Sequence, residues 1–246
     1  MVATEAELRA QARDRDSTPS FARALARPDV AVIAEVKRQS PSKGVINAGI
    51  NAADQALAYA NGGAAALSIL TEPAEFGGSV ADLIAARGVT TIPTLKKDFH
   101  VHPIQALEAR AAGASAMLLI ARALAPDRLR EMADAAAEHG VEILVEIRSE
   151  AELEDALAID ALVIGVNARD LETLIIEPAV TERILRLIPP DRIAIAESGV
   201  AGRADVERAA ALGADAVLVG SSISSSSDPT AAVAALTGIQ RGTRGR

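Results

Sequence analysis

The sequence predicts an α/β protein in which eight strand–helix units follow one another along the chain. Short runs rich in Val, Ile, Leu and Ala alternate with Ala-rich segments whose apolar residues recur with helical spacing. The runs lack alternating polar residues, which is typical of parallel strands that helices cover on both faces. Eight such units in 246 residues fit the size of a TIM barrel. We therefore expect a single (β/α)8 TIM barrel with an N-terminal helical extension.

The predicted strands are the eight apolar runs, each bounded by polar residues, Gly or Pro. They lie at residues 30–36, 64–70, 91–96, 115–120, 141–147, 161–166, 192–198 and 215–220. A helical segment follows each of them. These segments lie near residues 52–61, 79–87, 103–112, 126–139, 149–158, 177–187, 202–212 and 228–237. Every strand thus has its own helix, as the repeated unit of a barrel requires.

A Gly-Ala pair precedes three of the strands, at Gly63, Gly113 and Gly213. Glycine at this point is a common helix C-cap. The recurrence indicates one repeated unit, so we predict a single domain over residues 1–246. A doubly wound open sheet is the alternative fold, but no G-x-G-x-x-G follows the first strand.

The two ends of the chain and one internal run fall outside the repeat. Residues 1–29 are predicted as a helical extension that covers either the bottom of the barrel or its mouth. The Ser-rich run 221–227 is predicted as a loop, and residues 240–246 as a flexible tail.

Composition narrows the possible partners and the cellular location. With 33 acidic and 25 basic residues the net charge is −8, which disfavours binding to nucleic acid or to an anionic membrane. The chain has no Cys, and its first twenty residues contain no apolar segment. We therefore expect a cytoplasmic protein. The sequence leaves the oligomeric state open, with a monomer slightly favoured.

Charged residues stand at the predicted carboxyl ends of the strands, where TIM barrels carry their functional groups. Glu35, Glu146 and Glu197 each interrupt an apolar run, and a buried carboxylate is costly unless it is paired. Lys37 and Lys97 end strands at the same predicted rim. Such a set suits acid–base chemistry on an anionic substrate. A structural ring of ion pairs is the alternative reading.

Lysine is rare in this chain. Only four of the 25 basic residues are Lys, at positions 37, 43, 96 and 97. An ammonium group exchanges its proton near neutral pH and a guanidinium group does not, so the lysines mark positions where Arg would not serve. Chance placement of four lysines on loops is the alternative interpretation.

Other rim residues suggest a ligand. Gly199, Gly220 and Ser221 follow the last two strands, where TIM barrels commonly bind phosphate through backbone N–H groups. Phe76 and Phe99 lie in post-strand loops and either stack on a ring or pack locally. His100 and His102 have no other Cys or His nearby, so we expect solvated loop residues and no metal site.

Seven stretches of the chain resemble indole-3-glycerol phosphate synthase, a TIM-barrel enzyme of tryptophan biosynthesis. They are IAEVKRQSPSKG (33–44), LSILTEPAEFGGS (67–79), PTLKKDFHVHPIQALEARAAGA (93–114), LVEI (144–147), IGVNARDLETL (164–174), IAESGV (195–200) and LVGSSI (218–223). Their order and spacing make the resemblance specific.

The resemblance implies roles for the catalytic residues. Lys97 would be the general acid at the substrate carbonyl, and Glu146 would accept a proton during dehydration. Lys37 would hold an anionic group of the substrate and serve as a second acid, with Glu35 orienting the lysines. The remaining members of the catalytic set, which would position the substrate, are Asn167 and Glu197.

The resemblance also implies binding positions for a small, anionic, phosphorylated substrate. Those around the phosphate are Ser198, Gly199, Gly220 and Ser221, and those of the remaining pocket are Ser40, Phe76, Phe99, Arg169 and Leu171, with the two Phe residues facing the anthranilate ring. The implied reaction closes a ring in carboxyphenylamino-deoxyribulose phosphate and releases CO2 and water. It involves no redox step, so no cofactor is expected.

The chain departs from the family pattern in the eighth loop, SSISSSSDP, which is Ser-rich and has no Met after Ser-Ser-Ile. This puts the affinity for phosphate in question, not the reaction. Two other functions stay open. One is a sister barrel enzyme such as phosphoribosylanthranilate isomerase, which would need another acid–base pair. The other is a non-catalytic partner subunit, which would tolerate loss of the charged rim.

Overall fold

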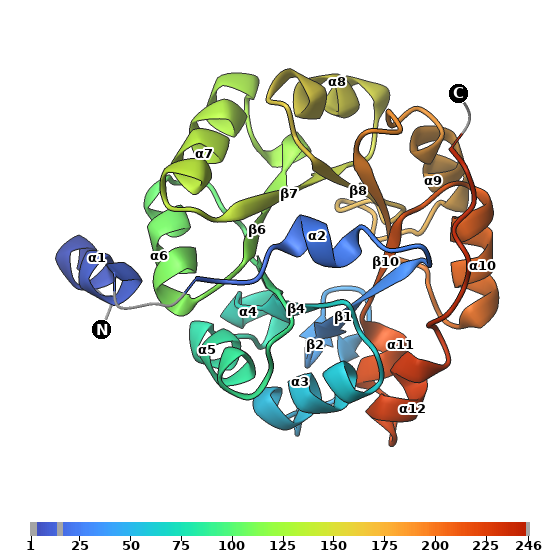
Figure 1. Ribbon diagram of the computed structural model, residues 1–246, viewed down its shortest axis with the longest axis horizontal. Helices are drawn as coiled ribbons and strands as arrows, with labels where there is room; N and C mark the ends of the chain where they lie inside the picture. The colour runs from blue at the N-terminus through green and yellow to red at the C-terminus, as the bar shows by residue number, and fades with distance from the viewer. Residues whose placement is uncertain (1–3, 14–16, 245–246) are drawn as a thin grey trace.

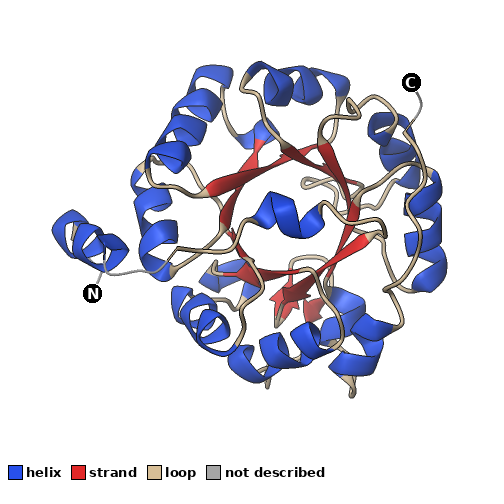
Figure 2. Ribbon diagram, viewed as in Figure 1, coloured by secondary structure: helices blue, strands red, loops and turns tan. Residues whose placement is uncertain are grey.

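The computed structural model describes residues 4–13 and 17–244, and its parallel strands close into a barrel (Figures 1 and 2). The strands lie in the order β1-β10-β9-β8-β7-β6-β5-β4, with β4 paired to β1. Their bounds are β1 Ala31–Val36, β4 Ala66–Leu70, β5 Thr94–Lys97, β6 Ala116–Ile120, β7 Glu142–Ile147, β8 Val163–Asn167, β9 Ile193–Glu197 and β10 Ala216–Val219. The prediction of a (β/α)8 TIM barrel is confirmed.

Helices surround the barrel, one after each strand (Figure 2). They are α3 Ala52–Asn61, α5 Val80–Val89, α6 Ile104–Ala112, α7 Pro126–Glu138, α8 Glu150–Ala158, α9 Pro178–Leu185, α10 Arg203–Ala211 and α12 Pro229–Ala234. Side chains of Asn51, Ser79 and Ser149 cap the N-termini of α3, α5 and α8. The Gly-Ala pairs end helices as predicted, since Gly63, Gly113 and Gly213 have φ of 92°, 85° and 86°.

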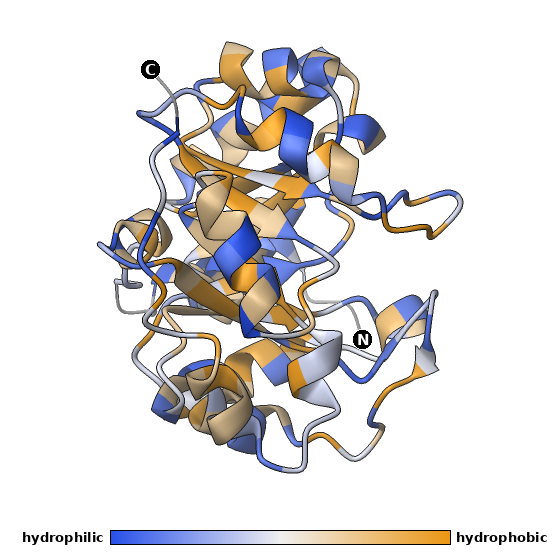
Figure 3. Cartoon of the chain, turned by 90° about the vertical axis from the view of Figure 1, so that its right-hand side faces the viewer, coloured by the Kyte–Doolittle hydropathy of each residue, from blue (hydrophilic) through white to orange (hydrophobic). Residues whose placement is uncertain are grey.

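Two apolar clusters fill the molecule, one between strands and helices and one inside the barrel. Figure 3 shows the apolar strands in orange between helices that carry hydrophilic residues. Successive side chains on a strand point to opposite faces, so on β1 Val32 and Ala34 belong to the outer cluster and Ile33 to the inner one. Two residues further along four of the strands, a charged side chain therefore points to the same inner face, at the mouth of the barrel. The steps run from Ile33 to Glu35, Leu95 to Lys97, Leu144 to Glu146 and Ile195 to Glu197.

The N-terminal extension contains two helices, α1 Glu5–Arg13 and α2 Phe21–Leu25. Figure 1 shows α1 beside α6 and α2 across one end of the barrel. The backbone N–H groups of Phe21 and Ala22 donate to the carboxylate of Glu142, at 3.1 and 2.7 Å, where β7 begins. The extension therefore covers the bottom of the barrel and leaves the mouth open. No helix in the described part of the chain is long and apolar enough to cross a membrane.

Five short elements are not predicted from the sequence. They are the hairpin of β2 Gln39–Ser40 and β3 Gly44–Val45, and the single turns α4 Pro73–Phe76, η1 Ala121–Ala123 and α11 Ser221–Ser224. The predicted loop over 221–227 is thus wrong for its first four residues. In α11 the carbonyl of Gly220 accepts bonds from the N–H groups of Ile223 and Ser224, at 3.1 and 2.9 Å.

The predicted flexible tail, residues 240–246, is held to the barrel through residue 244. Arg241 and Arg244 both form ion pairs with Asp215, a buried carboxylate at the start of β10. A buried carboxylate needs such partners, and these two come from the tail. Residues 245–246 lie outside the described residues. That the whole chain forms one domain stays a prediction.

Candidate active site

A cavity of about 630 Å³ opens at the carboxyl ends of the strands. All fifteen site residues predicted from the sequence line it. They are Glu35, Lys37, Ser40, Phe76, Lys97, Phe99, Glu146, Asn167, Arg169, Leu171, Glu197, Ser198, Gly199, Gly220 and Ser221.

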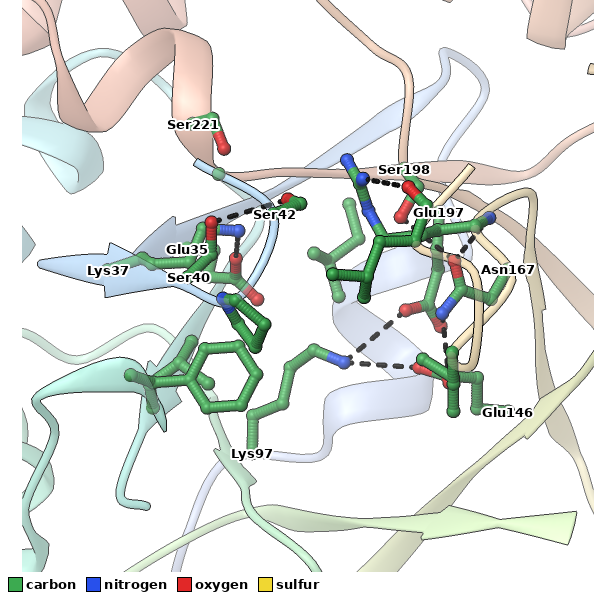
Figure 4. Close-up of a pocket in the computed structure, with 18 of the residues that line it drawn as sticks. Glu35, Lys37, Ser40, Ser42, Lys97, Glu146, Asn167, Glu197, Ser198 and Ser221 are labelled. Atoms are coloured by element: carbon green, nitrogen blue, oxygen red, sulfur yellow. Dashed lines mark hydrogen bonds and ion pairs between the residues drawn. The ribbon is translucent and has the colours of Figure 1, made fainter. Parts of the chain in front are cut away.

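Lys97 lies among carboxylates at the bottom of this cavity (Figure 4). Its Nζ is 3.2 Å from Oε2 of Glu146 and 3.6 Å from Oε2 of Glu197, and both carboxylates are buried. Asn167 donates to Oε1 of Glu146 at 3.0 Å, and Ser198 donates to Oδ1 of Asn167 at 2.8 Å. Four strand ends are thereby linked in one hydrogen-bonded network.

The network sets the protonation states of its members. Burial opposes the charged form of Lys97, but the carboxylates around it outweigh burial and raise its pKa. Burial likewise opposes the ionised form of Glu146, but Lys97 and Asn167 outweigh it and lower the pKa of that carboxyl. At neutral pH the pair is therefore an ammonium next to a carboxylate.

Glu197 behaves differently. Burial raises its pKa to about 8, and the charge of Glu146 adds to that effect against the attraction of Lys97. Although Lys97 lies within ion-pair distance of both carboxylates, it is closer to Glu146. One ammonium compensates one carboxylate here, so we assign the charge to Glu146 and the neutral form to Glu197.

A second lysine lies across the cavity. Nζ of Lys37 is 2.6 Å from Oε1 of Glu35, which is buried. Gly220, which directly follows the neighbouring strand β10, leaves room for this pair, because a Cβ there would collide with the Glu35 carboxylate and lie 2.8 Å from Nζ of Lys37. The ammonium of Lys37 and the backbone of Gly220 thus face the same part of the cavity.

The loops after β9 and β10 meet beside this lysine. Gly199 has φ of 82°, a left-handed conformation that glycine adopts without strain, and Ser198 has φ of 64°. Ser222 Oγ donates to the carbonyl oxygen of Val200 at 3.2 Å and joins the two loops. Glycine backbones, hydroxyls and one ammonium in this corner suit a phosphate group.

The opposite wall of the cavity is apolar. The rings of Phe76 and Phe99 lie with their centroids 6.2 Å apart at an angle of 49°. Phe99 is 46% exposed, so it presents apolar surface that a planar ring can cover. Leu171, in the loop after β8, is 43% exposed and adds apolar surface on another side of the cavity.

Two residues with structural importance at the site were missed in the sequence. The guanidinium of Arg38 binds both carboxylate oxygens of Asp82 at 2.7 and 2.8 Å and the carbonyl oxygen of Gly77 at 3.0 Å, which holds the hairpin to the loop of Phe76. Gly165 on β8 makes space for Glu197, because a Cβ would collide with that carboxylate. A glycine inside a predicted strand was the available signal for Gly165. Arg38 gave none.

Lys96 points away from the cavity, into the helix layer. It is fully buried, with Nζ 3.1 Å from Oδ2 of Asp98, 3.0 Å from Oε2 of Glu108 and 3.2 Å from Nε2 of His100. Of the adjacent lysines on β5, only Lys97 reaches the cavity.

The expectation that His100 is a solvated loop residue is wrong. Its ring is buried, and Nδ1 lies 2.7 Å from the carbonyl oxygen of Leu118. Burial and the charge of Lys96 lower the pKa of His100 to about 4. His102 is exposed. Over residues 4–13 and 17–244, no three His, Cys, Asp or Glu side chains gather closely enough to hold a metal ion.

The chain matches known proteins over nearly its full length. Residues 2–236 match the family Indole-3-glycerol phosphate synthase. The curated indole-3-glycerol phosphate synthase of Nocardioides sp. is 48% identical over 239 residues, which cover 96% of this chain and 90% of the relative. That of Opitutus terrae is 47% identical over 241 residues and covers 94% and 90%.

Solved structures with low sequence identity share the fold. Thiamine phosphate pyrophosphorylase from Pyrococcus furiosus aligns with a TM-score of 0.63 at 15% identity, over 88% of this chain and 96% of its own. KGPDC from Streptococcus mutans aligns with a TM-score of 0.65 at 13% identity, over 85% and 95%. These likenesses support the barrel fold alone, whereas the relatives above show the family. The chain belongs to the indole-3-glycerol phosphate synthase family.

Proposed function

We propose that this chain converts carboxyphenylamino-deoxyribulose 5-phosphate into indole-3-glycerol phosphate, CO2 and water. The observation that carries the proposal is the position of Lys97, whose ammonium lies 3.2 Å from Glu146 and 3.6 Å from Glu197 at the bottom of the cavity. Family membership supports the same reaction.

The first step is ring closure. The aromatic carbon that bears the carboxylate attacks the ribulose carbonyl carbon, and Lys97 donates its proton to the carbonyl oxygen, which becomes a hydroxyl. The raised pKa of Lys97 keeps it protonated until that oxygen becomes basic. Loss of CO2 then returns the bonding electrons to the ring.

The second step removes water. Glu146 takes a proton from the methylene carbon between the nitrogen and the hydroxyl-bearing carbon, and the hydroxyl leaves as water after protonation by an ammonium group. Lys37 is a candidate for this second acid, and Lys97 is another once it has regained a proton from solvent. The lowered pKa of Glu146 keeps it ionised and ready to accept the proton.

Binding divides between the two sides of the cavity. The phosphate lies against Ser198, Gly199, Gly220 and Ser221, next to the ammonium of Lys37. The anthranilate ring lies against Phe76, Phe99 and Leu171, and its carboxylate faces the cationic side chains of the mouth. Ser40 and Arg169 complete the pocket as further binding residues.

No cofactor is assigned. The cytoplasmic location is a prediction from the sequence alone, which leaves the oligomeric state open with a monomer slightly favoured. An isomerase of the same fold would need an acid–base pair other than Lys97 and Glu146. A non-catalytic subunit would bind the substrate without turning it over.

The test is product formation by the purified chain alone. Because the chain has no Trp and a single Tyr, indole product should appear as new fluorescence over a dark background. We expect turnover without added metal and with a chelator present. Folded protein that binds substrate without indole emission would favour the non-catalytic reading. Emission that disappears with the chelator and returns with metal would contradict the cofactor-free reaction.

A further inference from the structure

The last residue of α11 joins the phosphate corner of the cavity to strand β1. Ser224 is fully buried, and its Oγ donates to the carbonyl oxygen of Glu35 at 2.9 Å. The same Oγ lies 3.1 Å from Oη of Tyr59, and that Oη lies 3.3 Å from the Glu35 carbonyl oxygen. Both hydroxyls are thus placed to donate to the Glu35 carbonyl oxygen, and each lies within hydrogen-bond distance of the other. The result is a buried hydrogen-bonded series from Tyr59 through Ser224 to the backbone of β1.

These hydrogen bonds determine where the turn of α11 lies. The N–H of Ser224 donates to the carbonyl oxygen of Gly220 at 2.9 Å, so the two residues are fixed relative to each other. On its other side the turn is held by Ser222, which donates to the carbonyl of Val200. The segment Gly220–Ser222 is thus fastened on one side to the loop after β9 and on the other to β1.

The hydroxyls of Ser224 and Tyr59 are both buried. A buried hydroxyl is costly unless it is hydrogen-bonded, and both Ser224 and Tyr59 are bonded here. Burial also raises the pKa of Tyr59 to about 12, as expected for a phenol held in its neutral, proton-donating form.

We propose that Ser224 is a positioning residue that holds the phosphate-binding turn Gly220–Ser222 at a fixed place relative to β1 and couples occupation of that turn to Tyr59. The inference rests on the proposed function, in which this turn contacts the substrate phosphate. Lys97 and Glu146 lie on β5 and β7, away from Ser224, so the residue acts on binding and not on proton transfer.

The kinetic test uses Ser224→Ala, which removes a donor to the Glu35 carbonyl oxygen and the hydrogen-bond partner of the Tyr59 hydroxyl. We expect KM to rise about five- to tenfold, as for loss of one buried hydrogen bond. We expect kcat to stay within about twofold, because the groups that transfer protons are unchanged. Tyr59→Phe removes only the Tyr59 hydroxyl, which lies farther from the phosphate-binding turn, and should raise KM about twofold. The test therefore does not depend on the folding of one variant.

Ser227→Ala is the matched control. Ser227 belongs to the same Ser-rich run and is exposed. This variant should keep the KM and kcat of the parent chain.

The binding test uses Tyr59 as a reporter, since it is the only Tyr and the chain has no Trp. Titration with inorganic phosphate should give a saturable near-ultraviolet difference spectrum of Tyr59 in the parent chain and in Ser227→Ala. In Ser224→Ala the signal should be lost, or the phosphate concentration at half-saturation should rise about five- to tenfold.

Two results would overturn the inference. One is a KM and a phosphate affinity in Ser224→Ala equal to those of Ser227→Ala. The other is a fall in kcat with KM unchanged, which would place Ser224 in the chemistry. Absence of turnover by the parent chain, with the phosphate signal of Tyr59 intact and dependent on Ser224, would refute the proposed function and leave the inference standing. Turnover without any response of Tyr59 to phosphate would overturn the coupling alone.

Discussion

Nζ of Lys97 lies 3.2 Å from Oε2 of Glu146, so the proposed acid and the proposed base are within hydrogen-bond distance before substrate binds. Their charges stabilise each other, which accounts for the raised pKa of Lys97 and the lowered pKa of Glu146. In the proposed reaction, substrate would enter between them and separate the pair, and each group would then face a reacting atom in the protonation state that its step requires.

Glu146→Gln should lower kcat about tenfold or more while KM changes much less. The amide has nearly the same shape as the carboxylate and still accepts the bond from Asn167, but it takes up no proton. Steady-state kinetics with separate kcat and KM values checks this. A rise in KM with kcat unchanged would make Glu146 a binding residue.

Of the two adjacent lysines on β5, loss of Lys96 should mainly lower stability and loss of Lys97 should mainly lower activity. Lys96→Met leaves Asp98 and Glu108 without their cation, so the free energy of unfolding should fall by about 1–3 kcal/mol. This loss is smaller than for a fully buried ion pair, because both carboxylates are partly exposed to solvent. Its kcat should remain far above that of Lys97→Met. Urea denaturation and steady-state kinetics of the two variants provide the comparison, and equal loss of activity in both would contradict the assignment of opposite faces.

Stability should depend on pH through Glu197, whose pKa in the folded chain is raised from 4.5 to about 8. Below pH 4.5 both the folded and the unfolded chain hold the proton. As pH rises from 4.5 to 8 the unfolded chain releases it and the folded chain does not, so this group lowers the free energy of unfolding across that window.

Glu197→Gln removes this titration. The Tm of the variant, relative to that of the parent chain, should therefore increase between pH 5 and pH 8 in thermal melts followed by circular dichroism. A Tm difference that stays constant, or that moves in the opposite direction, would show that Glu197 is ionised in the folded chain.

Phosphate or sulfate soaked into crystals should bind against the backbone N–H groups of Gly199, Gly220 and Ser221, next to Lys37. Gly220→Ala should weaken this binding, because its Cβ would collide with the Glu35 carboxylate and displace Lys37. Crystal structures of both proteins in phosphate test the site. An ion elsewhere on the rim, with this corner empty, would be the contrary result.

The sequence predicts the elements whose signals are local. Apolar runs and helical periodicity give all eight strands and the helices that follow them. Site residues at strand ends can likewise be predicted from the sequence, because a barrel brings those ends together.

Contacts between residues far apart in the chain are not predictable in this way. Arg38 binds Asp82 across 44 positions, and Ser224 reaches Glu35 across 189. Serine has no strong helical preference, so the turn of α11 depends on such bonds, and the sequence alone predicts a loop there. His100 carried no sign of its burial, since its partner Lys96 is itself a charged residue.

The central claim is that Lys97 delivers the proton that allows ring closure. Its most direct test is a single-turnover measurement of indole emission with the parent chain, Lys97→Met and Lys97→Arg, at saturating substrate and with folding checked by circular dichroism. The parent chain should form indole, and neither variant should, because Met has no proton and a guanidinium does not release one near neutral pH. A rate for folded Lys97→Met close to that of the parent chain would contradict the account.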